Sequence, residues 1–107
     1  MPIQNKNVVT GWLAFPLVIK KNANFSRTDL QIYLENKDIQ TRTIFTGNIL
    51  RHPIMKNKYY KKHSQSHIIS DDVMRNRMLI GCHHDLRKKD LNRMTNIFKK
   101  LLDKYKK

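Results

Sequence analysis

The chain has 107 residues, a length that fits one domain spanning residues 1–107. Its 22 lysines and arginines against 8 aspartates and glutamates give a formal charge of +14, which indicates either a polyanionic partner or a lysine-rich composition alone. The single cysteine excludes an intrachain disulfide, and the longest apolar run, residues 12–19, is too short to span a bilayer. No signal-peptide pattern opens the sequence, so we expect a reducing cytoplasm.

The first half of the chain predicts a strand, a helix and a second strand. The continuous apolar run over residues 12–19 is typical of a strand buried on both faces, and Pro16 requires an edge position or a bulge. Ser26 with Asp29 forms a capping-box pattern that begins a helix. Residues 39–46 predict the second strand, which Gly47 ends.

The second half predicts an irregular excursion, a short helix, a third strand and a long helix. Residues 47–69 have no periodicity, and a helix is expected from Ser70 to about Arg77. A strand over 78–82 and a turn over 83–85 lead to a helix from about Lys88 to Tyr105. The apolar face of that last helix is predicted to be Leu91, Met94, Phe98, Leu101, Leu102 and Tyr105.

The order β-α-β-loop-α-β-α predicts an α/β (α+β) two-layer sandwich on a small three-stranded sheet. The hydrophobic fraction of 39% predicts a modest core, and the second face of so small a sheet would need a partner to cover it.

Two arrangements invite catalytic or metal chemistry. Cys82, His83 and His84 are ligand types for zinc, but neighbours on an extended chain point in opposite directions. His63 and His67 stand four apart in a stretch without a helical pattern. We therefore expect no metal site, and we interpret Cys82 as a small buried residue rather than a nucleophile.

The basic and aromatic run at residues 56–63 could bind single-stranded nucleic acid, but a solvated loop is the interpretation that the sequence favours. The basic last helix could lie on an anionic membrane, but its regular apolar face favours packing on its own sheet. The sequence thus favours neither nucleic acid nor a membrane as the partner.

Arg42 on a predicted strand and Asn48 just after a strand end are candidates for ligand binding. An arginine there suits a phosphate or carboxylate, and an asparagine can bind a sugar hydroxyl. A surface ion pair and a turn residue explain the same two positions equally well.

Several segments, in order and spacing, resemble the small C-terminal domain of the DegT/StrS-like enzymes, which use pyridoxal phosphate (PLP) and have fold type I. The nearest branch is similar to the CDP-4-keto-6-deoxyglucose 3-dehydrase-like proteins of deoxysugar and O-antigen (lipopolysaccharide) synthesis. The segments are Gly11-Trp12-Leu13-Ala14-Phe15-Pro16-Leu17, Phe25-Ser26-Arg27-Thr28-Asp29-Leu30, Thr41-Arg42, Phe45-Thr46-Gly47-Asn48, Arg51-His52-Pro53, Val73-Met74-Arg75-Asn76 and Ile80-Gly81-Cys82-His83-His84.

The resemblance implies a domain that closes over the cofactor cleft and binds a nucleotide sugar through Arg42, Asn48, His52 and His84. It also implies that the Schiff-base lysine, or the histidine that replaces it in the 3-dehydrase branch, belongs to a large domain absent from this chain. We therefore expect a fragment of a PLP-dependent aminotransferase or 3-dehydrase that has no catalytic residue, binds no PLP and is inactive alone.

Two other hypotheses stay open. The chain could be a stand-alone basic module that binds nucleic acid or a nucleotide sugar, or a homodimer that covers the face left by the missing large domain or subunit.

Overall fold

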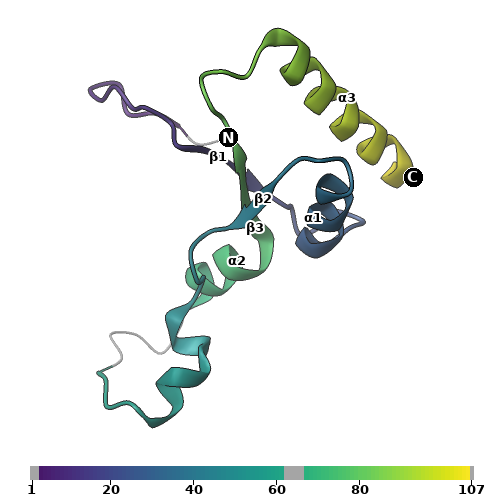
Figure 1. Ribbon diagram of the computed structural model, residues 1–107. Coiled ribbons are helices and arrows are strands. Elements are labelled where there is room, and N and C mark those ends of the chain that lie inside the picture. Colours follow the sequence, from purple (N-terminus) through teal and green to yellow (C-terminus); the bar gives the residue numbers. More distant parts are fainter. Residues whose placement is uncertain (1–2, 62–66, 107) are drawn as a thin grey trace.

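A computed structural model describes residues 3–61 and 67–106. The elements follow the chain as β1 (Ala14–Val18), α1 (Arg27–Glu35), β2 (Thr41–Thr43), the 3₁₀ helices η1 (Ile49–Arg51) and η2 (Pro53–Asn57), α2 (Ile68–Asn76), β3 (Arg77–Gly81) and α3 (Lys88–Tyr105) (Figure 1). In this part of the chain no helix has the length and apolar character needed to cross a membrane.

The three strands form one antiparallel sheet in the order β1-β3-β2. The predicted edge position of Pro16 is confirmed, because β1 pairs only with β3. Proline has no N–H to donate, so an edge strand is where the sheet tolerates it. One row across the sheet consists of Pro16, Leu79 and Arg42, which are paired in register.

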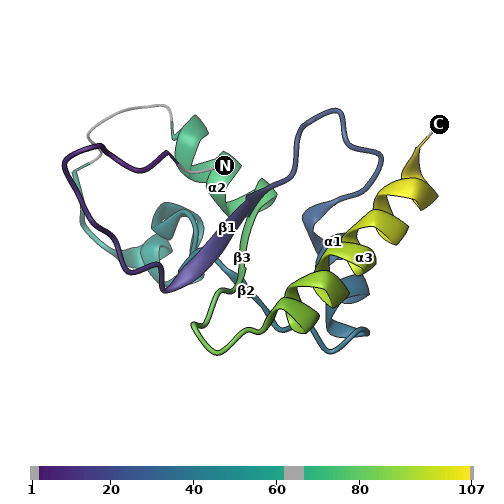
Figure 2. The same cartoon turned by 90° about the horizontal axis from the view of Figure 1, so that it is seen from above.

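Helices α1 and α3 lie together on one side of the sheet (Figure 2). The core between them and the sheet contains Leu34 and Met78, both fully buried, with Leu101 of α3 almost completely buried. Rings of Phe25 and Tyr105 meet at 5.1 Å between centroids, which fastens the C-terminal end of α3 to the loop after β1. The predicted two-layer α+β class is therefore confirmed.

Helix α1 begins where the sequence predicts, at a complete capping box. The Ser26 hydroxyl accepts a hydrogen bond from the Asp29 backbone N–H at 3.1 Å, and the Asp29 carboxylate accepts from the Ser26 backbone N–H at 2.8 Å. The pKa of Asp29 is lowered because its carboxylate accepts from the Ser26 backbone N–H, the larger cause, and from the Ser26 hydroxyl at 2.7 Å. The box satisfies donors that the first helical turn leaves without partners.

Two of the predicted boundaries and one predicted burial pattern are wrong. Strand β2 ends at Thr43 rather than at residue 46, because the chain turns at Phe45 and Gly47, which have positive φ angles of 47° and 69°. Helix α2 begins at Ile68 rather than Ser70. Strand β1 is half-buried and not buried on both faces, since only one face packs on the helices.

Helix α3 has the predicted bounds, but its apolar face is rotated slightly from the predicted one. Ile97 packs against the core, whereas Leu91 and Leu102 are about half exposed. The sequence pattern could not separate these positions because all of them lie within one broad apolar stripe.

The second face of the sheet is not covered by α1 or α3. Strand alternation places Pro16, Leu79 and Arg42 on this face, opposite Phe15, Met78 and Ile80, which belong to the core or pack against it. Leu79 is half-buried, and Val18 and Arg42 are exposed. We call this the open face.

Replacing Ser26 with alanine should lower the free energy of unfolding by about 1 kcal/mol, because the capping box loses its hydroxyl. Urea unfolding followed by circular dichroism measures the change. Thr28→Ala, an exposed position in the same helical turn, is the matched control and should change stability much less. Equal effects of the two substitutions would show that the cap contributes nothing.

Candidate functional site

Arg42 projects from the centre of β2 onto the open face and is exposed. Its register partner on β3 is Leu79. A guanidinium that stands beside an apolar strip can bind a phosphate or carboxylate bidentately while the strip receives a flat or apolar part of the same ligand. The position therefore suits the predicted binding role, which stays a prediction.

The loop after β2 is fixed by several hydrogen bonds and carries His52. The Gly47 N–H donates to the Ile44 carbonyl at 3.1 Å and closes a turn. His52 Nε2 lies 2.7 Å from the Thr46 carbonyl oxygen. A carbonyl oxygen can only accept, so Nε2 carries the proton and Nδ1 is the atom of His52 left for a ligand.

Asn48 is the one buried polar residue of the described chain, with 3% of its surface exposed. Its Oδ1 accepts from the Leu50 N–H at 3.1 Å and caps η1, and its Nδ2 donates to Asp71 at 2.8 Å. Both ends of the carboxamide thus hold the protein together, which fits the turn-residue interpretation. A contact from Asn48 to a sugar hydroxyl stays a prediction and would use the remaining N–H.

Asp71 of α2 anchors this loop. Its carboxylate accepts from Arg51 Nη2 at 2.6 Å and Arg51 Nε at 3.1 Å, in addition to Asn48, and 14% of its side chain is exposed. Hydrogen bonds from Arg51, then from Asn48, hold the pKa of Asp71 far below its ordinary value of 3.8. This bidentate clamp fixes residues 48–51 to α2.

His84 belongs to the segment after β3, and this segment leaves the sheet at the opposite end from the loop after β2 (Figure 1). The end of β3 pairs with the start of β2, whereas the loop of Asn48 and His52 continues from the end of β2. The structure therefore groups Asn48 with His52, places Arg42 between, and separates His84. Five-residue β3 spans about 17 Å, so only a long ligand along the open face could reach both groups.

Sequence reasoning missed the exposed, left-handed conformation of Phe45 in the loop that carries Asn48 and His52. Its side chain is 90% exposed, and its φ of 47° is a conformation that bulky residues rarely adopt. Only the neighbouring Gly47 hinted at a turn, and no sequence pattern indicates that a phenylalanine takes the left-handed conformation beside it.

The other candidates are surface features. Cys82 is only partly buried, where the sequence predicted a buried residue, and its Sγ donates to the Trp12 carbonyl oxygen at 3.1 Å. Lys58, Tyr59 and Lys61 of the basic run are exposed, as expected, whereas residues 62 and 63 lie outside the described residues. His63, whose pairing with His67 the sequence does not favour, lies outside them too.

Comparison with known proteins defines the class. Residues 1–99 match the model of the DegT/DnrJ/EryC1/StrS aminotransferase family, and the chain belongs to this family. The family's enzymes in general depend on PLP.

Two curated relatives are matched over shorter stretches. A dTDP-4-dehydro-2,6-dideoxy-D-glucose 3-dehydratase of Saccharopolyspora spinosa is 34% identical over 61 residues, which are 57% of this chain and 13% of that protein. The lipopolysaccharide biosynthesis protein RfbH of Salmonella typhimurium is 34% identical over 50 residues, 47% of this chain and 11% of that protein. The matched stretch is thus a small part of each relative's length.

The described residues do not fit a PLP site. A lysine that forms an imine works in a desolvated pocket, and every lysine that the structure describes is exposed. Within residues 3–61 and 67–106 the only buried polar side chain is that of Asn48, which is already hydrogen-bonded. We therefore derive no catalytic step through PLP from these residues.

Gly47→Ala should destabilise the protein by at least about 1 kcal/mol, because residue 47 has a positive φ and an added Cβ would collide with the Met74 side chain. Thermal unfolding measures the loss. Gly11→Ala is the control, since nothing lies within 4 Å of its added Cβ. If Gly47→Ala were as stable as Gly11→Ala, the close packing of this loop on α2 would be disproved.

The Asp71 clamp should make stability fall in acid. Its pKa is lower in the folded protein than in the unfolded chain, so the clamp stabilises fully above about pH 4 and is lost progressively as the pH falls further. Urea midpoints measured between pH 6 and pH 2 should decline more in the native sequence than in Asp71→Asn. Asp103→Asn, which changes an exposed carboxylate, should leave the decline as it is. Parallel curves for all three proteins would refute the clamp.

Proposed function

We propose that this chain is the C-terminal small domain of a PLP-dependent sugar-nucleotide aminotransferase or 3-dehydrase, and that it is inactive alone. The observation that carries the proposal is the family match over residues 1–99 in a fold whose sheet has one face left open. The missing large domain or subunit would supply PLP, the Schiff-base residue and the cover for that face.

The names of the two relatives support a proposal about the pathway. One is named for a reaction on a dTDP-linked deoxysugar, and the other for lipopolysaccharide biosynthesis. Their stretches of similarity lie within this small domain, so we place the chain in the synthesis of deoxysugars for lipopolysaccharide or a similar glycan.

The domain's own contribution would be to hold the nucleotide sugar. Arg42 would bind the diphosphate, because its guanidinium is exposed and has no ion-pair partner among the described residues. His52 Nδ1 would accept a hydrogen bond from a hydroxyl beside the loop, and Asn48 would hold that loop in place. His84 would meet the far end of an extended ligand.

The test is reconstitution with a large domain taken from either relative. The 107-residue chain purified alone should show no PLP absorbance and no turnover, and co-expression with the large domain should restore binding of dTDP-glucose or CDP-glucose. Turnover by the chain alone with added PLP would overturn the proposal. Salt-sensitive binding of nucleic acid, without any effect of a large domain, would favour the stand-alone basic module instead.

In the reconstituted protein, Arg42→Ala should weaken nucleotide-sugar binding tenfold or more, because a charge-assisted bidentate contact is lost. Isothermal titration calorimetry measures it. Arg93→Ala is the matched control, since Arg93 is an exposed arginine of α3, which lies on the other side of the sheet. Equal affinities of the two variants would remove Arg42 from the site while leaving the family role untouched.

A further inference from the structure

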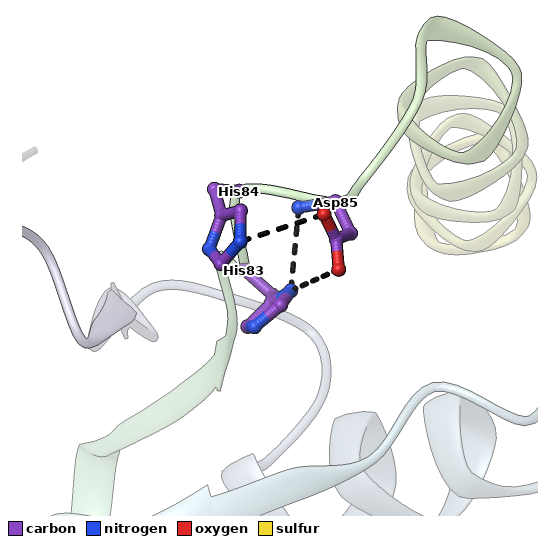
Figure 3. A group of neighbouring side chains, drawn as sticks. All are labelled: His83, His84 and Asp85. Carbon is purple, nitrogen blue, oxygen red and sulfur yellow. Dashed lines mark hydrogen bonds and ion pairs between the residues drawn. The ribbon is translucent and has the colours of Figure 1, made fainter.

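The turn between β3 and α3 gathers two imidazoles and a carboxylate at one point of the surface (Figure 3). One ligand atom from each of His83, His84 and Asp85 lies within 4.8 Å of the others. No other group of three histidine, cysteine or acidic side chains comes this close in the described residues. The three side chains are 65%, 83% and 80% exposed, so an ion could reach them directly.

The orientation of the side chains is that of a ligand set. His83 Nδ1 lies 3.6 Å from one Asp85 oxygen, and His84 Nε2 lies 3.4 Å from the other. The Asp85 backbone N–H donates to His83 Nδ1 at 3.2 Å, so this nitrogen carries no proton, and an ion bound there would replace that backbone donor at its lone pair. The two rings lie side by side, with centroids 4.1 Å apart.

These spacings are close to those of a coordination sphere. Ligands about 2.0–2.1 Å from a tetrahedral zinc ion are about 3.3 Å from one another. The two nitrogen–oxygen distances already nearly match that value, and all three ligand atoms lie within 4.8 Å of one another.

On an extended chain His83 and His84 would point in opposite directions, but both lie in or beside the turn that the sequence predicts over residues 83–85. Strand β3 ends at Gly81, and the turn over residues 84 and 85 brings neighbouring side chains to one side. Cys82, which the sequence grouped with the two histidines, donates a hydrogen bond to the Trp12 carbonyl and is not part of this cluster. The three grouped residues are thus 83–85 rather than 82–84, and the Asp85 carboxylate takes the place of the Cys82 thiol.

We propose that His83, His84 and Asp85 form a surface site for a divalent transition metal, with two nitrogen ligands and one oxygen ligand. Imidazole and carboxylate ligands suit Ni²⁺, Cu²⁺ and Zn²⁺, with Cu²⁺ bound most tightly in the usual order of affinities. Because the site is exposed, its remaining coordination positions are open to water or to a donor from another molecule. The inference rests on this turn alone and does not depend on the proposed enzymatic role.

The test titrates the untagged full chain with NiCl₂ by isothermal titration calorimetry and with CuCl₂ by electron paramagnetic resonance. The native chain should bind one ion, and the copper spectrum should show hyperfine coupling to two nitrogens. His83→Asn with His84→Asn should weaken binding at least tenfold and remove the nitrogen coupling. Asp85→Asn should weaken it less and retain the coupling.

The control is His52→Asn with His67→Asn, which removes the same number of imidazoles from outside the turn. It should bind nickel as the native chain does. If it loses binding as strongly as the His83 and His84 variant, or if the native chain shows no saturable binding, the proposal is wrong. All the replaced positions of the turn are exposed, so circular dichroism should show an unchanged fold.

Discussion

The structure depends on β3, the only strand of the described sheet that pairs on both sides. Residues 14–18 and 41–43 are far from residues 77–81 in sequence, yet both pair with them. Met78 and Ile80 bury their side chains beneath α1 and α3, so the same five residues organise the sheet and the core. Because closing such long loops costs chain entropy, native pairing requires most of the domain to be in place at once.

Helix α2 connects β3 to the loop that carries Asn48 and His52, and it holds that loop in place. It leads directly into β3, and its Asp71 and Met74 hold residues 47–51 from two directions. The loop has no sheet or long helix of its own, so its shape depends on these side-chain contacts. Arg42, by contrast, is placed by strand pairing, and His84 by the turn after β3. Three separate devices thus position the candidate residues.

The features predictable from sequence are those encoded by neighbours along the chain. Ser26 and Asp29 predict a capping box, and Pro16 restricts its strand to an edge. The apolar residues within 88–105 repeat at the helical period. The failures involve partners distant in sequence or unusual backbone. The end of β2 is set by positive φ at Phe45 and Gly47, and the clamp joins Asn48 and Arg51 to a residue more than 19 positions away. The sequence predicted the turn over residues 83–85, but residue types do not show that the side chains of His83, His84 and Asp85 converge there.

Pro16 has one more effect, which concerns growth of the sheet. It lies in the middle of β1 and pairs with Leu79, and as a proline it can offer no backbone donor to a strand approaching from outside. A second copy of the chain therefore cannot continue the ladder of hydrogen bonds past this residue, and a misfolded neighbour meets the same interruption. At the opposite margin β2 has only three residues, too few for a long template. Both margins of the described sheet therefore resist fibril-like extension.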